Sequence, residues 1–194
     1  DAALAWHSGP AAGTGLVSTT ANRALKIEFF GQTAHAGNTP WEGRSALDAA
    51  EIATHAINMM REHVRPTARL HYIFESAGQA PNIVPDYARL WLTLREADTP
   101  TVEALVEWTR QIAEGAALAT QTRAETRVFA GCAELIPNRP LAERLLTRMS
   151  EHGLAWSEAE QEFARVCQRE MGLPERGMAT EILPLVPETS IGGS

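Results

Sequence analysis

The chain has 194 residues, and 44% of them are hydrophobic, which is enough for one sizeable domain or for one domain with part of a neighbour. Its 24 acidic residues outnumber its 17 Lys and Arg residues, and the net charge of −7 argues against a nucleic acid or an anionic membrane as a partner. No apolar run is long enough to span a membrane, and we expect no signal peptide at the start.

The first predicted elements are a strand and a long helix. Residues 24–30 alternate apolar and polar side chains, as a half-buried strand does. A helix is predicted over residues 40–64, because apolar residues recur there at steps of three and four. Thr39 is its expected N-cap, Pro40 suits the first helical position, and Glu42 would complete a capping box with Thr39.

Two more strands, a second helix and a fourth strand follow. Residues 69–75 and 88–95 alternate again, and residues 122–129 form the last strand. Thr99 is the expected cap of a second helix and Pro100 its first residue, and the apolar stripe of this helix extends to residue 116. The order β-α-β-β-α-β predicts an α+β, ferredoxin-like fold, in which a four-stranded antiparallel sheet carries two helices on one face.

The rest of the chain is predicted to be helical and then irregular. Asn138 can cap a helix over residues 141–152, and Ser157 with Glu160 forms a capping box for another helix that ends near Gly172. Beyond that point Gly, Pro and Ser are frequent, and no period remains. We therefore expect a C-terminal helical segment after the sheet.

The two cysteines predict a reducing compartment. Cys132 and Cys167 lie in unlike contexts, and neither belongs to a CxxC motif. This pattern favours free thiols in a cytoplasmic protein over a disulfide framework.

The loop after the first strand carries the most informative histidine. The sequence GQTAHAG places His35 between two alanines, on a short polar loop in front of a helix. A histidine held in this way can present its imidazole to a ligand outside the core, or it can be an ordinary satisfied histidine of the surface.

Two segments together resemble a known family. GQTAHAG with the following TP lies at residues 31–40, and PNIVP at residues 81–85 leads into a strand that ends at Arg95. These segments resemble the lid, or dimerisation, domain of the metal-dependent aminoacylase and carboxypeptidase superfamily. The wording is most similar to the aminobenzoyl-glutamate utilization branch of that superfamily. The resemblance extends over about residues 6–120 and is weak beyond Gly131.

The resemblance implies a division of the chain into three parts. Residues 1–20 would be a remnant of, or linker from, a catalytic domain. Residues 21–130 would be the lid, and residues 131–194 a helical insert with an incomplete return to the catalytic domain.

The resemblance also implies a role for three side chains. His35 matches the lid histidine that reaches across the dimer and stabilises the oxyanion at the scissile carbonyl, so we expect it to be catalytic. Asn82 and Arg95 match residues that bind the free carboxylate of the substrate, and a guanidinium suits a carboxylate because it donates two parallel hydrogen bonds. The alternatives are a turn asparagine and a solvated arginine at a strand end.

The superfamily implies a two-metal centre with manganese or zinc. His7, in the phrase WHSGP, matches one metal ligand, although a histidine near a terminus can also simply lie at the surface. The other ligands have no counterpart in this sequence. We expect the full-length enzyme to be metal-dependent, and this chain alone to hold no metal and to be inactive.

The predicted function is the dimerisation and substrate-clamping lid of a metal-dependent amidohydrolase. The resemblance implies an N-acyl or aminobenzoyl amino acid as substrate, with glutamate as the amino acid. It implies as partner a second copy or a related subunit, paired through an edge strand and a helix. The competing interpretation is a stand-alone ferredoxin-like binding or oligomerisation module without catalysis. An RNA-binding sheet is disfavoured by the acidic charge and the lack of a basic-aromatic motif.

Overall fold

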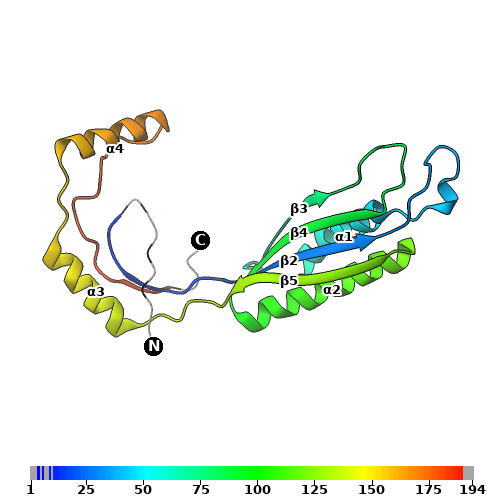
Figure 1. Ribbon diagram of the computed structural model, residues 1–194. Helices are drawn as coiled ribbons and strands as arrows, with labels where there is room; N and C mark the ends of the chain where they lie inside the picture. The colour runs from blue at the N-terminus through cyan, green and yellow to red at the C-terminus, as the bar shows by residue number, and fades with distance from the viewer. Residues whose placement is uncertain (1–3, 5, 7–8, 10, 190–194) are drawn as a thin grey trace. The chain divides into compact units, whose positions relative to one another are not determined.

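The computed structural model describes residues 4, 6, 9 and 11–189. Contacts divide the chain into two compact units, one at residues 19–135 and one formed by residues before 19 and after 135. The first unit contains the four strands labelled β2 to β5 in Figure 1, and the second contains helices α3 and α4.

The unit at residues 19–135 is a four-stranded antiparallel sheet with two helices on one face, which confirms the predicted ferredoxin-like fold (Figure 1). The strands lie in the order β3-β4-β2-β5, so β3 and β5 are the edges. The elements in chain order are β2 (Ala21–Phe30), α1 (Ala46–Met60), β3 (Arg69–Ser76), β4 (Tyr87–Glu96), α2 (Thr99–Thr120) and β5 (Arg123–Cys132).

The core lies between the sheet and the two helices. Alternate residues of the central strands face it, and the apolar ones among them are almost completely buried: Leu25, Ile27, Phe29, Ala88, Leu90, Leu92 and Leu94. Helix α1 contributes mainly alanines, among them Ala49, Ala50 and Ala53, and these small side chains let the helix lie close to the sheet. Removing a large side chain such as Leu25 would leave a cavity and cost about 2–5 kcal/mol.

The predicted start of the first helix is wrong. Thr39 precedes only a 3₁₀ turn, Pro40–Glu42, and its side chain makes no capping hydrogen bond. Helix α1 begins at Ala46, where Ser45 Oγ accepts a hydrogen bond from Asp48 N at 3.1 Å. The physical reason is an isolated antiparallel bridge: Gln32 and Arg44 exchange two backbone hydrogen bonds, at 2.8 and 2.9 Å. This bridge keeps Arg44 in an extended conformation, so the helix cannot begin before it.

Three other predicted boundaries shift slightly. Helix α1 ends at Met60 and is followed by a separate 3₁₀ turn, Arg61–His63. The N-cap of α2 is Asp98 and not Thr99, because the Asp98 carboxylate accepts from Thr101 N at 2.8 Å. Strand β5 continues past residue 129 to Cys132, and residues 130–132 still pair with β2 beyond an irregularity in the register.

The second unit contains a short parallel pair of strands. β1 (Gly15–Val17) pairs with β6 (Val186–Thr189), and Thr14 Oγ1 donates to Ala142 O on α3 at 3.1 Å. The sequence pattern predicts no strand after residue 172, and the structure corrects this. A strand of four residues whose partner lies near the other end of the chain leaves no local period to detect.

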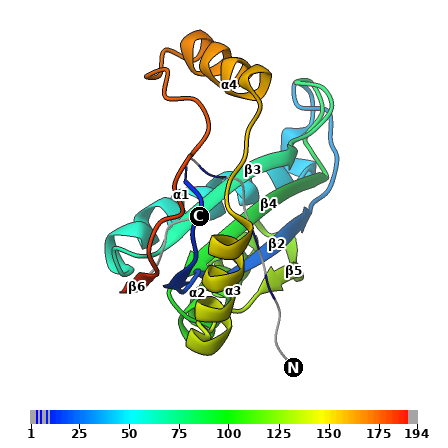
Figure 2. The ribbon, with the colours of Figure 1, turned by 90° about the vertical axis from the view of Figure 1, so that its left-hand side faces the viewer.

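The two predicted helices of this unit are present (Figure 2). In α3 (Arg139–His152) the side chain of Asn138 accepts from Leu141 N at 3.0 Å. In α4 (Glu158–Glu170) Ser157 and Glu160 form the predicted reciprocal capping box. None of the helices in the described part of the chain is long and apolar enough to cross a membrane.

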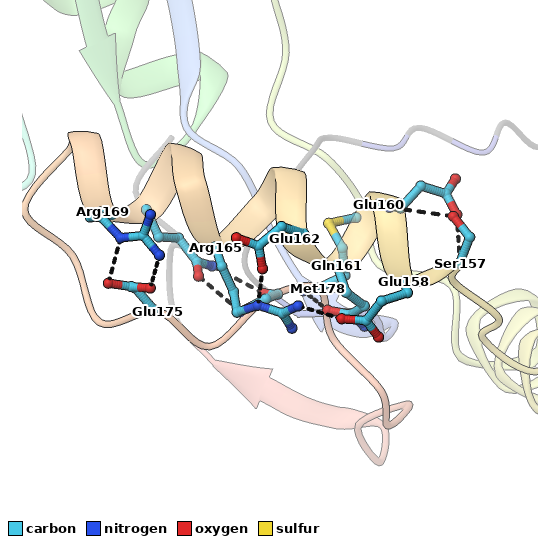
Figure 3. A network of polar contacts seen from close by, with 11 residues as sticks. Ser157, Glu158, Glu160, Gln161, Glu162, Arg165, Arg169, Glu175 and Met178 are labelled. Carbon is cyan, nitrogen blue, oxygen red and sulfur yellow. Dashed lines mark hydrogen bonds and ion pairs between the residues drawn. The ribbon is translucent and has the colours of Figure 1, made fainter.

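The segment after α4 is held against the helix by side-chain contacts (Figure 3). Arg169 donates two hydrogen bonds to the Glu175 carboxylate, at 2.9 and 2.7 Å. The side-chain oxygen of Gln161 accepts from Met178 N at 2.8 Å. Helix α4 and this segment therefore form one local structure.

Candidate functional site

His35 lies in an exposed loop that begins where β2 ends. Its ring nitrogen Nδ1 accepts hydrogen bonds from the backbone N–H groups of Gly37 and Asn38, both at 3.1 Å. A nitrogen that accepts from an N–H carries no proton, so the proton of the neutral ring lies on Nε2. The loop therefore presents one ring donor, the Nε2–H group of His35.

A second loop is joined to the first by backbone hydrogen bonds. Ala36 N donates to Asn82 O and Val84 N donates to Ala34 O, both at 3.0 Å, so the two loops form a short antiparallel bridge at His35. The side chain of Asn82 is exposed. The structure thus brings His35 and Asn82 to the same end of the sheet.

Arg95 lies at the opposite end of the sheet. In the pairing of β2 with β4, Phe30 lies opposite Tyr87 and Asn22 lies opposite Arg95. Eight residue steps along β4 separate Tyr87 from Arg95, about 26 Å at the usual rise of a strand. One copy of the sheet unit therefore brings His35 and Asn82 together but leaves Arg95 far from both.

Arg95 belongs to the sheet face that neither helix covers, which we call the open face. The strand register places one set of side chains on it. These are Asn22, Ala24, Lys26, Glu28 and Phe30 of β2, Arg69, His71, Ile73 and Glu75 of β3, and Tyr87, Arg89, Trp91, Thr93 and Arg95 of β4.

The carboxylates of the open face on β2 and β3 are paired with neighbouring donors. Glu75 accepts a hydrogen bond from Lys26 at 3.1 Å and forms an ion pair with Arg89 at 2.8 Å, and Glu28 accepts a hydrogen bond from the Tyr87 hydroxyl at 2.6 Å. The hydrogen bond from Lys26 is the main reason that the pKa of Glu75 is lowered. Burial, and then the hydrogen bond to Glu28, raises the pKa of Tyr87.

Glu96 is a structural residue that the sequence analysis missed. It is completely buried, and its carboxylate accepts from the Thr67 hydroxyl (3.0 Å to Oε2) and from Ala97 N (3.0 Å). These bonds join the turn before β3 to the end of β4 and so fix the backbone beside Arg95. Glu96 continues the alternation of the buried residues Leu90, Leu92 and Leu94 along β4. This alternation is the signal that could have identified Glu96 as a residue that faces the core.

The described residues do not fit a divalent metal. Nowhere among them do three or more His, Cys, Asp or Glu side chains group in a way that could hold an ion. The predicted ligand His7 lies outside the described residues.

The outer face of α1 carries a shallow apolar groove. Its lining residues are Glu51, Ile52, His55, Ala56 and Met59, and its volume is about 460 Å³. Ile52 and Met59 are 42% and 59% exposed, which is unusual for such apolar side chains. The groove is a surface on which another protein could pack.

The chain is similar to known hydrolases, and the similarity includes the sheet unit. The model of the peptidase dimerisation domain family (M20_dimer) matches residues 19–121. One of the p-aminobenzoyl-glutamate hydrolase subunits of Escherichia coli K12 is 38% identical over 170 residues, which cover 87% of this chain and 35% of that protein. The Xaa-Arg dipeptidase of Mus musculus is 34% identical over 100 residues, or 52% of this chain and 23% of that protein.

Solved structures show the same fold. An aminobenzoyl-glutamate utilization protein from Klebsiella pneumoniae matches with a TM-score of 0.58 and 20% identity, over 91% of this chain and 48% of that one. A tripeptidase from Staphylococcus aureus matches with a TM-score of 0.59 and 25% identity, over 96% of this chain and 42% of that one. The chain spans about a third or less of the length of the two curated relatives described above. The match over residues 19–121 confirms the resemblance seen in the sequence, and the chain belongs to the peptidase dimerisation domain family.

Proposed function

We propose that this chain is the dimerisation and substrate-clamping lid of a metal-dependent amidohydrolase. The enzyme would hydrolyse the amide between an acyl or aminobenzoyl group and an amino acid, with glutamate as the favoured amino acid. Family membership supports a hydrolase as the parent protein. The relatives named p-aminobenzoyl-glutamate hydrolase and Xaa-Arg dipeptidase support cleavage of an amide to an amino acid.

The observation that carries the proposal is the fixed orientation of His35. Its Nδ1 is held by two backbone N–H groups, so Nε2–H is the donor that a substrate can meet. In amide hydrolysis the carbonyl oxygen becomes negative, and one well-placed donor at that oxygen contributes about 2.7–4 kcal/mol in comparable enzymes. An imidazole that is already oriented needs little reorganisation to act in this way.

The placement of Arg95 favours a site built from two copies of the lid. His35 and Asn82 lie at one end of the sheet, and Arg95 lies about 26 Å away along β4. Only a few bonds separate the scissile carbonyl of an acyl amino acid from its free carboxylate. One substrate would therefore contact His35 and Asn82 of one copy and Arg95 of another.

The exposed groove of α1 and the edge strand β3 supply a surface for this pairing. Asn58 on α1 donates to the Tyr72 hydroxyl on β3 at 3.0 Å, so the helix and the edge belong to one side of the unit. An uncovered edge strand can extend a sheet across two subunits. The partner would be a second copy or a related protein. Matches to two different subunits of the p-aminobenzoyl-glutamate hydrolase of Escherichia coli support this choice.

The catalytic centre would lie outside the described residues. We assign the divalent metal, manganese or zinc, to that part of the enzyme, where it would supply the activated water. The lid residues would bind the carboxylate and donate to the carbonyl oxygen. The two cysteines are exposed free thiols, which supports a cytoplasmic enzyme.

The test is His35→Ala in the intact enzyme, with aminobenzoyl-glutamate as substrate. A donor that acts only as charge develops should lower kcat by roughly 10²–10³-fold and leave KM nearly unchanged. His152→Ala is the matched control, because that exposed histidine ends a helix of the other unit. An unchanged kcat in the His35 variant would contradict the proposed role.

A further inference from the structure

An isoleucine lies directly opposite His35 in the bridge between the two loops. His35 and Ile83 are the paired residues of this isolated antiparallel bridge. The two hydrogen bonds of the bridge join the residues on either side of them, so His35 and Ile83 form a non-hydrogen-bonded pair. In such a pair the Cα atoms are about 4.5 Å apart, and the two side chains lie on the same side of the backbone. The side chain of Ile83 is therefore a direct neighbour of the His35 imidazole.

The residues next to this pair are more buried than the pair itself. Ile83 is 44% exposed, while the next residue, Val84, is half-buried and packs against Gly43 of the other loop. The alanines on either side of His35 are also half-buried, while His35 is exposed. Side chains of extended backbone alternate between two sides, so the side of the bridge that carries His35 and Ile83 faces solvent.

The backbone holds Ile83 in place on both sides. Its own N–H donates to Ala80 O at 3.2 Å, and the N–H of Val84 donates to Ala34 O at 3.0 Å. An isoleucine is also stiff about χ1, because it is branched at Cβ. The apolar surface beside His35 is thus ordered before a ligand arrives, and binding to it removes little further entropy.

The chemistry of the substrate indicates which of its groups would meet this surface. In an N-acyl amino acid, the scissile carbonyl carbon is bonded to the oxygen, the amide nitrogen and the acyl group. In the proposed function the oxygen meets Nε2–H of His35, and Asn82 and Arg95 bind the free carboxylate. The acyl group is the remaining substituent, one bond from the carbonyl carbon. Contact with Ile83 would favour an apolar acyl group, because burying apolar surface is favourable and burying an unpaired charge is costly.

We propose that Ile83 contacts the acyl group of the substrate and determines a preference for a large apolar acyl group, such as an aromatic ring, over a small one. The inference rests on the proposed function, and it identifies the substrate class as N-aroyl amino acids. His35 and Ile83 are paired within one copy of the chain. The donor to the carbonyl oxygen and the contact with the acyl group therefore come from the same copy.

The test compares aminobenzoyl-glutamate with acetyl-glutamate, which has the same amino acid and the same amide but a methyl group in place of the ring. Ile83→Ala in the intact enzyme should lower kcat/KM for aminobenzoyl-glutamate roughly 10–100-fold, because the apolar contact with the ring is lost. It should leave kcat/KM for acetyl-glutamate within about threefold. Ile83→Thr should lose more of the preference than Ile83→Val, because the two variants differ mainly by a hydroxyl group.

Ile136→Ala is the matched control, because that isoleucine is 84% exposed and belongs to the other unit, and both substrates should be unaffected. An unchanged ratio of the two kcat/KM values in Ile83→Ala would overturn the inference even if both rates fell, because loss of folding would lower them equally. A wild-type enzyme that cleaved acetyl-glutamate as well as aminobenzoyl-glutamate would also overturn it, while the proposed function would stand. If neither substrate were cleaved, the proposed function itself would fail, and the role of Ile83 with it.

Discussion

Single side chains in the sheet unit are oriented by backbone groups close to them in the sequence. His35 is held by the N–H groups of Gly37 and Asn38, and Arg69 is held by the carbonyls of Pro66 and Ala68. In each case the local turn engages one part of the side chain and leaves another part outside that contact. Such preorganisation lowers the entropy that binding must remove.

Asp98 gives the fold a pH dependence that can be measured. Its carboxylate accepts from the hydroxyl and the backbone N–H of Thr101, and these bonds lower its pKa from the ordinary value of 3.8. A carboxyl whose pKa is lower in the folded state stabilises the fold above its unfolded pKa. That contribution is lost as the pH falls through the folded pKa.

The variant Asp98→Asn should therefore be less sensitive to acid than the wild type. An asparagine can still cap the helix, but it does not titrate. Urea unfolding at about pH 5 and again below about pH 3 should show a smaller loss of stability in the variant. Equal losses in the two proteins would show that Asp98 does not contribute to the acid sensitivity.

At the scale of elements, the helix start after the His35 loop determines how that loop is supported. The bridge between Gln32 and Arg44 closes the loop, and Ser45 caps α1 directly after it. Gly43 lies so close to Val84 that an added Cβ would come within 2.9 Å of that side chain. The loop of His35 is thus packed against the loop of Asn82 by contacts that lie outside the helix.

The corrected N-cap can be tested by two serine and threonine variants. Ser45→Ala should cost about 0.5–2 kcal/mol of unfolding free energy, because the N–H of Asp48 loses its partner. Thr39→Ala should change stability by less than about 0.5 kcal/mol, since the Thr39 side chain makes no cap contact. Denaturant titration of both variants distinguishes the two helix starts, and the opposite ranking would favour a helix that begins at Pro40.

The elements that could be predicted from the sequence are those with a local period. The strands near residues 25, 70 and 90 alternate on their own, and Ser157 with Glu160 marks a helix start within four residues. The start of α1 and the strand β6 depend on partners distant in the sequence, so no local pattern reveals them. The roles of His35, Asn82 and Arg95 were predicted from the family resemblance. The strand predicted over residues 88–95 is long, and this length alone could have predicted that Arg95 lies far from the loop of His35.

At the scale of the whole molecule, the proposed sharing of sites between two copies can be tested by complementation. If each site takes His35 from one copy and Arg95 from the other, two different defects can complement each other. A dimer of a His35→Ala copy with an Arg95→Gln copy would keep one complete site and lose the other.

Co-expression of the two variants with different tags gives the measurement. The purified mixed dimer should show about half of the wild-type activity, while each variant alone is impaired. An inactive mixed dimer would show that both residues serve a site within one copy. A dimer of wild type with the double variant is the control, and in the shared arrangement it should have almost no activity.

The chain enters and leaves the sheet unit at one place. Leu135 N donates to Thr19 Oγ1 at 3.1 Å, so the first and last residues of the unit are hydrogen-bonded neighbours. The whole sheet unit lies in the sequence between β1 and β6, which pair with each other, so it is an insertion of more than a hundred residues between two paired strands. The entropic cost of closing a loop rises only slowly with the length of the loop. The sheet unit can therefore change in length or in sequence without disturbing the pairing of β1 with β6.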